Sequence, residues 1–273
     1  MVDHPELFLL APQQHRRSDN TTTEAREVEE NGKWRGIPYN DPDLTHLFKA
    51  SGSQIFWAYN WDSISNGAET FWEFVPMLWS DTSDHTSRWF DNVDKAVKAG
   101  TWHVLSFNEP DGCANGGSCM QDIGRAVYAY RQYIHPLYAK YDGNVRLSAP
   151  AVTNGAPPMG LDYLRRFLSA CNDCRIDWVV IHWYGAADNS GDFKKHAQEA
   201  YEAGGKRPIW ITEFGAYGSE DQIIGFLNDV LPWLDHPDQK YIYRYAYQWA
   251  APGSLVNGVG DGLSAIGQLY AFH

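Results

Sequence analysis

The sequence predicts a single (β/α)8 barrel, and three observations support that fold class. Apolar strand-like runs, eight in all, alternate with amphipathic helical stretches along most of the 273-residue chain. These runs are apolar on both faces, which is typical of parallel strands covered by helices. No G-x-G-x-x-G segment follows any of them, which argues against a doubly wound dinucleotide-binding sheet. Eight units therefore favour a closed barrel.

The periodicity of the sequence sets the expected order of the elements. Strands are expected at 34–40, 54–61, 71–79, 102–109, 145–153, 176–184, 208–215 and 242–249. Helices are expected at 43–51, 86–99, 120–141, 160–172, 192–203, 220–234 and 262–271. The connection at 63–69 leaves room for a short helix at most.

The first 33 residues differ from the rest in lacking strand patterning. We expect 1–33 to be an irregular or partly disordered extension and 34–273 to be the barrel. The apolar segment 8–11 is too short for the core of a signal peptide, and Asn20 opens a glycosylation sequon.

Composition excludes several classes of function. With 22 basic and 34 acidic residues the net charge is −12, which argues against nucleic-acid binding. No run of 18 apolar residues occurs, so no membrane span is expected. Aromatic residues make up 15% of the chain. They suit either a Trp-rich core or rings that stack on sugars, and composition does not separate the two. We expect a monomer without a metal or cofactor.

The four cysteines fall into two local pairs. Cys113 and Cys119 flank a glycine-rich stretch, and Cys171 and Cys174 form a C-x-x-C. A joint zinc site is the rival reading, but no histidine stands at finger-like spacing beside either pair. We favour two local disulfides and hence an oxidising compartment outside the cell.

Catalytic residues of (β/α)8 barrels sit at the carboxyl ends of the strands. The polar and aromatic residues expected there are Tyr39, Asn40, Asn60, Trp61, Asp62, Trp79, Asn108, Glu109, Asp111, Asn154, His182, Tyr184, Glu213 and Trp249.

Two glutamates in this set are placed alike. Glu109 and Glu213 each end an apolar strand, and they are about three βα units apart, which sets them across the barrel mouth. A carboxylate inside an apolar strand is costly without a role or a partner. Two convergent carboxyl groups suit glycoside hydrolysis, in which one protonates the leaving oxygen and the other attacks the anomeric carbon. Metal binding is the competing role, with Asp62 and Asp111 as the neighbouring carboxylates.

The chain resembles the clan A glycoside hydrolases, and more narrowly glycoside hydrolase family 128, whose members act on β-1,3-glucan. The resemblance runs in order through 35–40, 57–61, 75–79, 107–111, 171–177, 182–184 and 210–215. In the last strand Arg244, Tyr245 and Ala246 fit the pattern, whereas Tyr247, Gln248 and Trp249 replace an expected Trp-Phe pair.

The resemblance implies a role for each matching residue. It implies Glu109 as acid/base, Glu213 as nucleophile and Asn108 as a partner of the sugar 2-hydroxyl in a retaining β-1,3-glucan hydrolase. Tyr184 is expected to orient Glu213. The remaining substrate-binding candidates are Tyr39, Asn60, Trp61, Trp79, His182 and Trp249. Two other tryptophans, Trp183 and Trp210, are expected to face the helix layer.

Three alternatives stay open at this stage: a β-1,3-glucan-binding protein on the same barrel with weak or no turnover, another clan A specificity such as mannan or cellulose, and a metal-dependent barrel enzyme.

Overall fold

The computed structural model describes residues 34–68, 72–114 and 116–273. The expected extension 1–33 lies outside the described residues, and the barrel is described here by itself.

The described strands form one parallel sheet in the order β3-β2-β1-β8-β7-β6-β5-β4. Their bounds are β1 (Trp34–Pro38), β2 (Ile55–Tyr59), β3 (Glu73–Phe74), β4 (His103–Val104), β5 (Arg146–Val152), β6 (Trp178–Ala186), β7 (Ile209–Tyr217) and β8 (Ile242–Tyr247). A parallel bridge between Met77 and Leu105 joins the two outer strands of this order. The amide of Leu105 donates to Pro76 O at 2.9 Å, and the amide of Leu78 donates to Leu105 O at 3.1 Å. The predicted (β/α)8 barrel is therefore confirmed.

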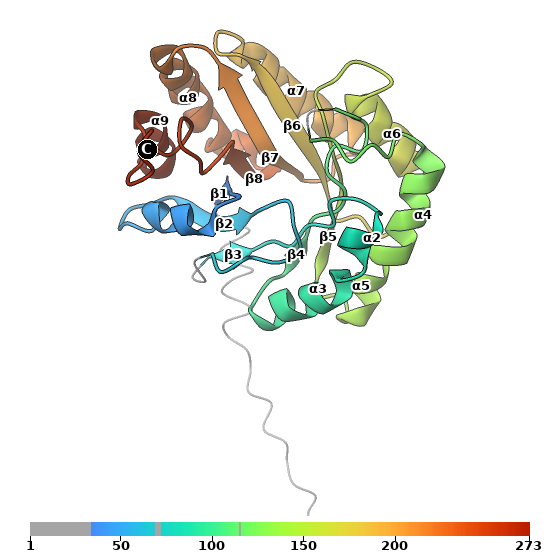
Figure 1. Ribbon diagram of the computed structural model, residues 1–273. Coiled ribbons are helices and arrows are strands. Elements are labelled where there is room, and N and C mark those ends of the chain that lie inside the picture. The colour runs from blue at the N-terminus through green and yellow to red at the C-terminus, as the bar shows by residue number, and fades with distance from the viewer. Residues whose placement is uncertain (1–33, 69–71, 115) are drawn as a thin grey trace, which may run out of the picture. The chain divides into compact units, whose positions relative to one another are not determined.

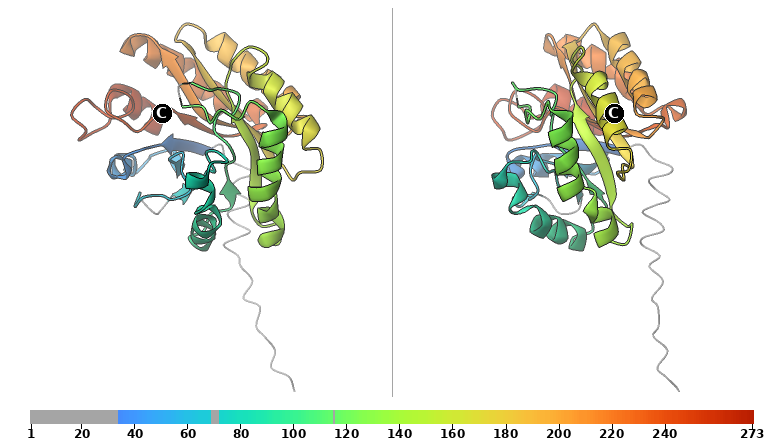
Figure 2. Two further views of the ribbon diagram at one scale, coloured as in Figure 1. Left: turned by 45° about the vertical axis from the view of Figure 1, so that its right-hand side comes forward. Right: turned by 90° about the vertical axis from the view of Figure 1, so that its right-hand side faces the viewer.

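Helices surround the sheet on its outer side (Figures 1 and 2). They are η1 (Pro42–Phe48), α2 (Ser83–Thr86), α3 (Trp89–Lys98), α4 (Ile123–Tyr133), α5 (Pro136–Lys140), α6 (Gly160–Ala170), α7 (Ser190–Ala203), α8 (Glu220–Leu234), η2 (Pro237–Gln239) and α9 (Ala265–Phe272). The described residues between β2 and β3 contain no helix, as the short connection predicted.

Local sequence explains which helix bounds were predictable. Helix α8 begins where expected because Ser219 and Gln222 form a capping box. The stretch expected as one helix at 120–141 is two helices, because Pro136 begins a new one. The stretch expected at 43–51 is a 3-10 helix rather than an α-helix.

Apolar side chains form two cores, one between sheet and helices and one inside the barrel. Trp183 belongs to the outer core, where its ring stacks on Phe226 of α8. Trp210 belongs to the barrel interior, where its ring stacks on Trp178 at 4.5 Å. The expectation that Trp210 faces the helices is therefore wrong. Its cause is a register shift in β7 between Ile211 and Phe214, which breaks the alternation counted from Glu213.

A charged cluster lies inside the barrel beside this tryptophan layer. Glu73 Oε2 accepts from Arg244 at 2.7 Å, and Glu73 Oε1 lies 2.8 Å from His103 Nδ1. The Arg244 guanidinium also lies 4.5 Å from the Trp210 ring centroid. Burial by itself would raise the pKa of Glu73, but Arg244 and His103 outweigh it and hold that pKa well below its usual range.

Both local disulfides are present, Cys113–Cys119 and Cys171–Cys174. In the described part of the chain, every helix is too short or too polar to cross a bilayer.

Candidate active site

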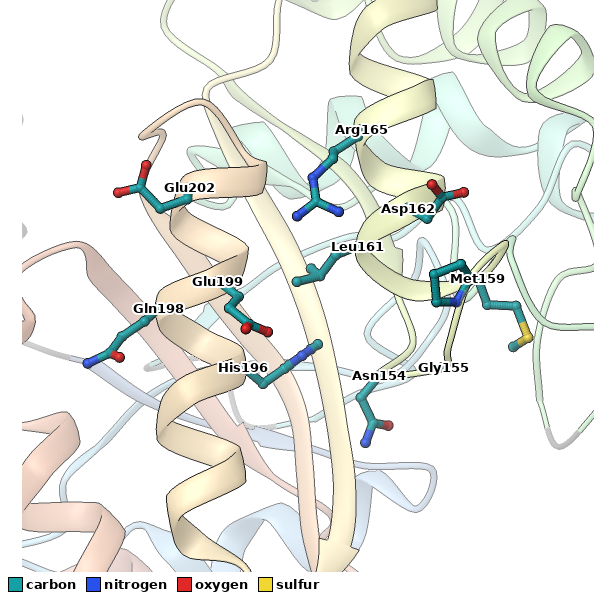
Figure 3. Close-up of a pocket in the computed structure, with 11 residues that line it drawn as sticks. Asn154, Gly155, Met159, Leu161, Asp162, Arg165, His196, Gln198, Glu199 and Glu202 are labelled. Carbon is teal, nitrogen blue, oxygen red and sulfur yellow. The ribbon is translucent and has the colours of Figure 1, made fainter.

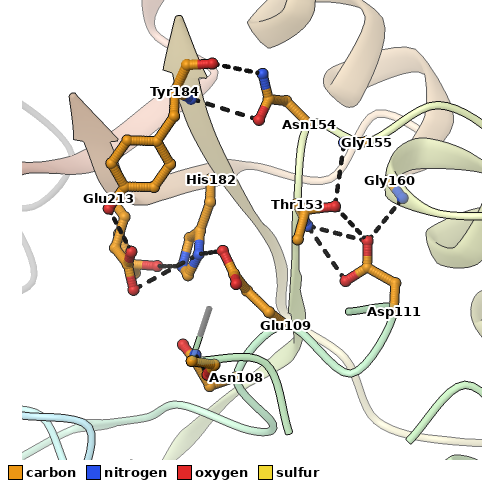
Figure 4. Close-up of polar contacts among 12 residues, drawn as sticks. Asn108, Glu109, Asp111, Thr153, Asn154, Gly155, Gly160, His182, Tyr184 and Glu213 are labelled. Carbon is orange, nitrogen blue, oxygen red and sulfur yellow. Dashed lines mark hydrogen bonds and ion pairs between the residues drawn. The ribbon is translucent and has the colours of Figure 1, made fainter. Parts of the chain in front are cut away.

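The two glutamates meet at the carboxyl ends of the strands (Figure 4). Glu109 follows β4 and Glu213 lies in β7, and one carboxylate oxygen of each lies within 4.8 Å of the other. Both side chains are largely buried, with 13% of Glu109 and 7% of Glu213 exposed. This spacing suits two carboxyl groups acting on one small reacting centre.

Glu213 is held by donors on both of its oxygens. The Tyr184 hydroxyl donates to Oε2 at 2.6 Å, and the Trp61 indole donates to Oε1 at 2.7 Å. The Tyr59 hydroxyl lies 3.4 Å from Oε1 and also donates to Thr212 O at 3.1 Å. These hydrogen bonds fix the Glu213 carboxyl group in one orientation.

A bulge in β7 produces this arrangement. Ile181 pairs with Ile211 and His182 pairs with Glu213, so Thr212 is an extra residue relative to β6. Thr212 and Glu213 consequently both face the barrel interior, since the Thr212 hydroxyl lies 2.8 Å from His182 Nε2. Gly215 then leaves room for Tyr184, because a Cβ there would stand 2.9 Å from Tyr184 Cε1.

His182 connects the two glutamates and is fully buried. Its Nδ1 lies 2.8 Å from Glu109 Oε1 and 3.5 Å from Glu213 Oε1. Burial by itself would lower the pKa of His182, but the neighbouring charges of Glu213 and Glu109 outweigh it, and the pKa is raised. His182 therefore lies between two carboxyl groups that favour its protonated form.

The turn after β4 fixes the backbone of Glu109. Its amide donates to Ala151 O at 2.8 Å, and its carbonyl accepts from Gly112 at 3.0 Å. Its φ is +40°, in the left-handed region that residues with a Cβ rarely adopt. Asn108 is buried, and its side-chain amide donates to Gly116 O at 3.0 Å inside the loop closed by Cys113 and Cys119. This loop therefore rests directly on the segment that carries Glu109.

Half-buried tryptophans lie next to the residues of the site: Trp61 bonds Glu213, and the backbone oxygen of Trp79 accepts from the Asn108 amide at 3.0 Å. The Trp61 and Trp249 rings meet edge to face at 5.8 Å, and Trp79 lies 5.3 Å from the His85 ring. Tyr217, at the end of β7, is 66% exposed and stacks on Tyr184. Sequence reasoning missed Tyr217 because it ended this strand at residue 215. It also missed Thr212, which the bulge brings inward, and Tyr59, although Tyr59 stands two residues from the inward-facing Trp57 and Trp61.

Two predicted substrate-binding residues have other contacts. Tyr39 is fully buried in the core between sheet and helices, and its hydroxyl donates to Ser65 O at 2.7 Å. Asn60 is 7% exposed, and its side chain bonds Ile64 O and the Asp62 amide. Both residues therefore shape the loop after β2 and do not present free polar groups to a ligand.

The carboxylates offered as additional metal ligands are engaged elsewhere. Asp62 pairs with Arg88 at 3.0 Å, and Asp111 bonds Thr153 and Gly160. Among the described residues, Glu109, His182 and Glu213 are close enough to share an ion, but the oxygens of Glu213 already face N–H and O–H donors. These contacts favour acid–base chemistry over a metal centre.

A separate pocket lies between α6 and α7 (Figure 3). Its volume is about 530 Å³, and charged residues including Asp162, Arg165 and Glu199 line it. Its lining residues include the imidazole of His196 but no tryptophan, tyrosine or phenylalanine, so it lacks the indole faces found near the glutamates. It adjoins the site at Asn154, whose side chain bonds the Tyr184 backbone.

The fold and the paired buried carboxyl groups define a barrel glycoside hydrolase. Residues 36–270 match the family model described as glycosyl hydrolase catalytic core, and the chain belongs to that family. The chain is a glycoside hydrolase, and its resemblance to family 128 is confirmed by solved structures.

Two solved structures of family 128 illustrate the likeness. One is a subgroup III curdlan-specific exo-β-1,3-glucanase from Blastomyces gilchristii, 36% identical with a TM-score of 0.78, covering 89% of this chain and 98% of that chain. Another is a subgroup I endo-β-1,3-glucanase from Amycolatopsis mediterranei, solved with laminaritriose, 27% identical with a TM-score of 0.69, covering 88% and 98%.

A curated relative is also similar. The alkali-sensitive linkage protein 1 of Schizosaccharomyces pombe is 31% identical over 252 residues, which are 86% of this chain and 43% of that protein. The chain thus spans less than half the length of this relative.

Proposed function

We propose that this protein hydrolyses β-1,3-glucan with retention of anomeric configuration, with Glu213 as nucleophile and Glu109 as acid/base. The single observation that carries this proposal is that one carboxylate oxygen of Glu109 and one of Glu213 lie within 4.8 Å of each other, which leaves little room for a water molecule between them. Retaining glycosidases place these groups about 5–5.5 Å apart, whereas inverting enzymes leave roughly 6.5–9.5 Å for a water molecule.

The first half of the reaction forms a covalent intermediate. A Glu213 oxygen attacks the anomeric carbon while the glycosidic C–O bond breaks, and Glu109 gives its proton to the departing sugar oxygen. Glu213 must be ionised for this step, and the donors of Tyr184 and Trp61 hold its carboxyl group in place for the attack. Glu109 must be protonated.

The second half regenerates the enzyme. Glu109, now ionised, removes a proton from water as the water oxygen attacks the anomeric carbon. The bond to Glu213 breaks, and its carboxylate returns to the donors of Tyr184 and Trp61. His182 Nδ1 lies 2.8 Å from Glu109 Oε1, where an N–H group can donate to the carboxylate after proton transfer. Asn108, adjacent to Glu109, is assigned to the sugar 2-hydroxyl.

The substrate class follows from the relatives and from the rings at the barrel mouth. The subgroup III and subgroup I structures are β-1,3-glucanases by name, at 36% and 27% identity. Trp61, Trp79 and Trp249 supply half-buried faces on which the apolar side of a glucose ring can stack. The two disulfides support action in an oxidising compartment outside the cell, and we propose a monomer.

Product analysis on defined laminari-oligosaccharides tests this function. The wild type is expected to release shorter β-1,3-linked products, and Glu213→Gln and Glu109→Gln are expected to lose at least about 1,000-fold in kcat/KM while staying folded. Parallel panels of mannan and cellulose oligosaccharides check specificity. Release from those substrates alone would contradict the assignment, and laminari-oligosaccharide binding without release would support a binding protein instead.

A further inference from the structure

One buried carboxylate near the site has no part in the chemistry described above. Asp111 is 1% exposed and follows Glu109 by two residues. Its Oδ2 accepts from the Thr153 hydroxyl at 2.6 Å, from the Gly160 amide at 2.7 Å and from the Thr153 amide at 3.2 Å. A buried carboxylate costs much free energy unless its oxygens are satisfied, so these donors hold it firmly in place (Figure 4).

These donors come from the next βα unit of the barrel. Thr153 follows the last residue of β5, and Gly160 is the first residue of α6. The N-cap residue of α6, Met159, makes no side-chain capping bond. Asp111 supplies the missing acceptor from another loop, at the positive end of the helix dipole.

The contact is tightly shaped around Gly160. The φ of Gly160 is +57°, and a Cβ at this position would stand 2.3 Å from Gly155 O. A glycine here lets the chain turn so that its amide faces Asp111.

The turn that carries Glu109 is thus tied down at both ends. Its beginning is held by the bond from the Glu109 amide to Ala151 O at 2.8 Å, and its end is held by Asp111 on Thr153. The acceptor Ala151 lies in β5, and the donor Thr153 directly follows that strand. Between these points Glu109 adopts its positive φ, a backbone state that persists only when its surroundings enforce it.

We infer that Asp111 is a positioning residue that aims the Glu109 carboxyl at the glycosidic oxygen. Asp111 does not touch substrate and transfers no proton. Its hydrogen bonds to Thr153 and Gly160 fix the backbone turn after Glu109 and so the orientation of the Glu109 side chain. The inference rests on the proposed function, because it assigns Glu109 the role of general acid.

Leaving-group dependence tests the inference. General acid catalysis matters greatly for a sugar leaving group and little for a strongly acidic phenol, which departs without protonation. Asp111→Asn places an N–H group against the Thr153 donors. We expect kcat/KM on laminaritriose to fall about 100-fold, as for a misplacement on the order of 1 Å. On 2,4-dinitrophenyl β-laminaribioside we expect a fall below about 5-fold, by the same Brønsted argument.

Two controls separate positioning from loss of folded enzyme. A 2-deoxy-2-fluoro glycoside that traps the covalent intermediate counts active sites, so each rate is expressed per competent molecule. Glu109→Gln is the reference variant: its kcat/KM is expected to fall more on laminaritriose than on the dinitrophenyl glycoside, as for Asp111→Asn but to a larger extent. Thr153→Val removes the hydroxyl that donates to Asp111 and accepts from the Gly155 amide, and it keeps the Thr153 amide. It is expected to show the same difference between the two substrates at smaller amplitude, even where Asp111→Asn fails to fold.

Equal falls on both substrates, or no fall on either, in Asp111→Asn and Thr153→Val would overturn the inference. Such a result leaves the proposed function intact if the wild type is active on laminaritriose. A wild type that releases no product from laminaritriose refutes the proposed function itself.

Discussion

The charged cluster inside the barrel gives a prediction about stability. The Glu73 carboxylate lies 2.7 Å from the Arg244 guanidinium and 2.8 Å from His103 Nδ1, and it accepts a hydrogen bond from the Trp102 amide at 2.9 Å. Arg244 and His103 are each 5% exposed, so neither is well solvated if the carboxylate is removed. Glu73→Gln keeps the size of the side chain and deletes its charge.

The expected cost follows from the burial of the partners. Removing one member of a buried ion pair typically destabilises a protein by about 3–5 kcal/mol, because the remaining charge stays desolvated. Single domains have a total free energy of unfolding of about 5–15 kcal/mol, so Glu73→Gln removes a large share. Glu199→Gln is the matched control: Glu199 lies 3.5 Å from Lys195 in an exposed pair, and its loss is expected to cost below about 0.5 kcal/mol.

Urea denaturation followed by tryptophan fluorescence measures both variants. A lower midpoint with an unchanged slope shows lost stability without a change in the unfolding reaction. Because folding lowers the pKa of Glu73, its stabilisation is present above the ordinary value of 4.5 and is lost as pH falls below it. The gap between wild type and Glu73→Gln must therefore narrow in acid. A cost below about 1 kcal/mol at pH 7 would refute the reasoning about buried pairs.

Three further predictions concern the site. Replacing Cys113 and Cys119 by serine frees the loop beneath Asn108 and is expected to lower kcat/KM or change the product pattern, whereas serine at Cys171 and Cys174 is expected to leave both unchanged. Unchanged activity and products without the Cys113–Cys119 bond would make that disulfide a bystander. Folding raises the pKa of His182, so the stabilisation from its protonated form is present below about pH 6.5 and is lost as pH rises. The difference in unfolding free energy between wild type and His182→Asn is therefore expected to shrink from pH 6 to pH 9. A difference that grows over this range would contradict the raised pKa. Activity is expected to survive dialysis against EDTA, and loss restored by a divalent ion would support the metal alternative.

The fold was predictable because its signals are local. Each strand run is apolar and each helix amphipathic, and the capping box at Ser219 marks the start of α8. The short extents of β3 and β4 were not predictable, because pairing there depends on isolated bridges such as that between Met77 and Leu105. The cluster of Glu73, Arg244 and His103 also depends on pairing across the closed barrel, which periodicity does not report.

Part of the predicted set comes together in space. Direct contacts join Glu109, Glu213, His182, Tyr184 and Trp61, which come from the part of the barrel toward the carboxyl ends of the strands. Tyr39 satisfies the same rule of position, but its side chain faces the helices, and only the third dimension reveals this. Trp210 faces the barrel interior because an extra residue, Thr212, shifts the alternation of β7, and the apolar run of this strand carries no mark of the bulge.

The most direct test of the central claim is the configuration of the first product. Proton NMR follows the anomeric signals in the first minutes of laminari-oligosaccharide cleavage, before mutarotation mixes them. Double displacement by Glu213 and Glu109 predicts that the β-anomer appears first and the α-anomer grows in later. Initial appearance of the α-anomer would contradict a nucleophilic Glu213 and with it the proposed mechanism.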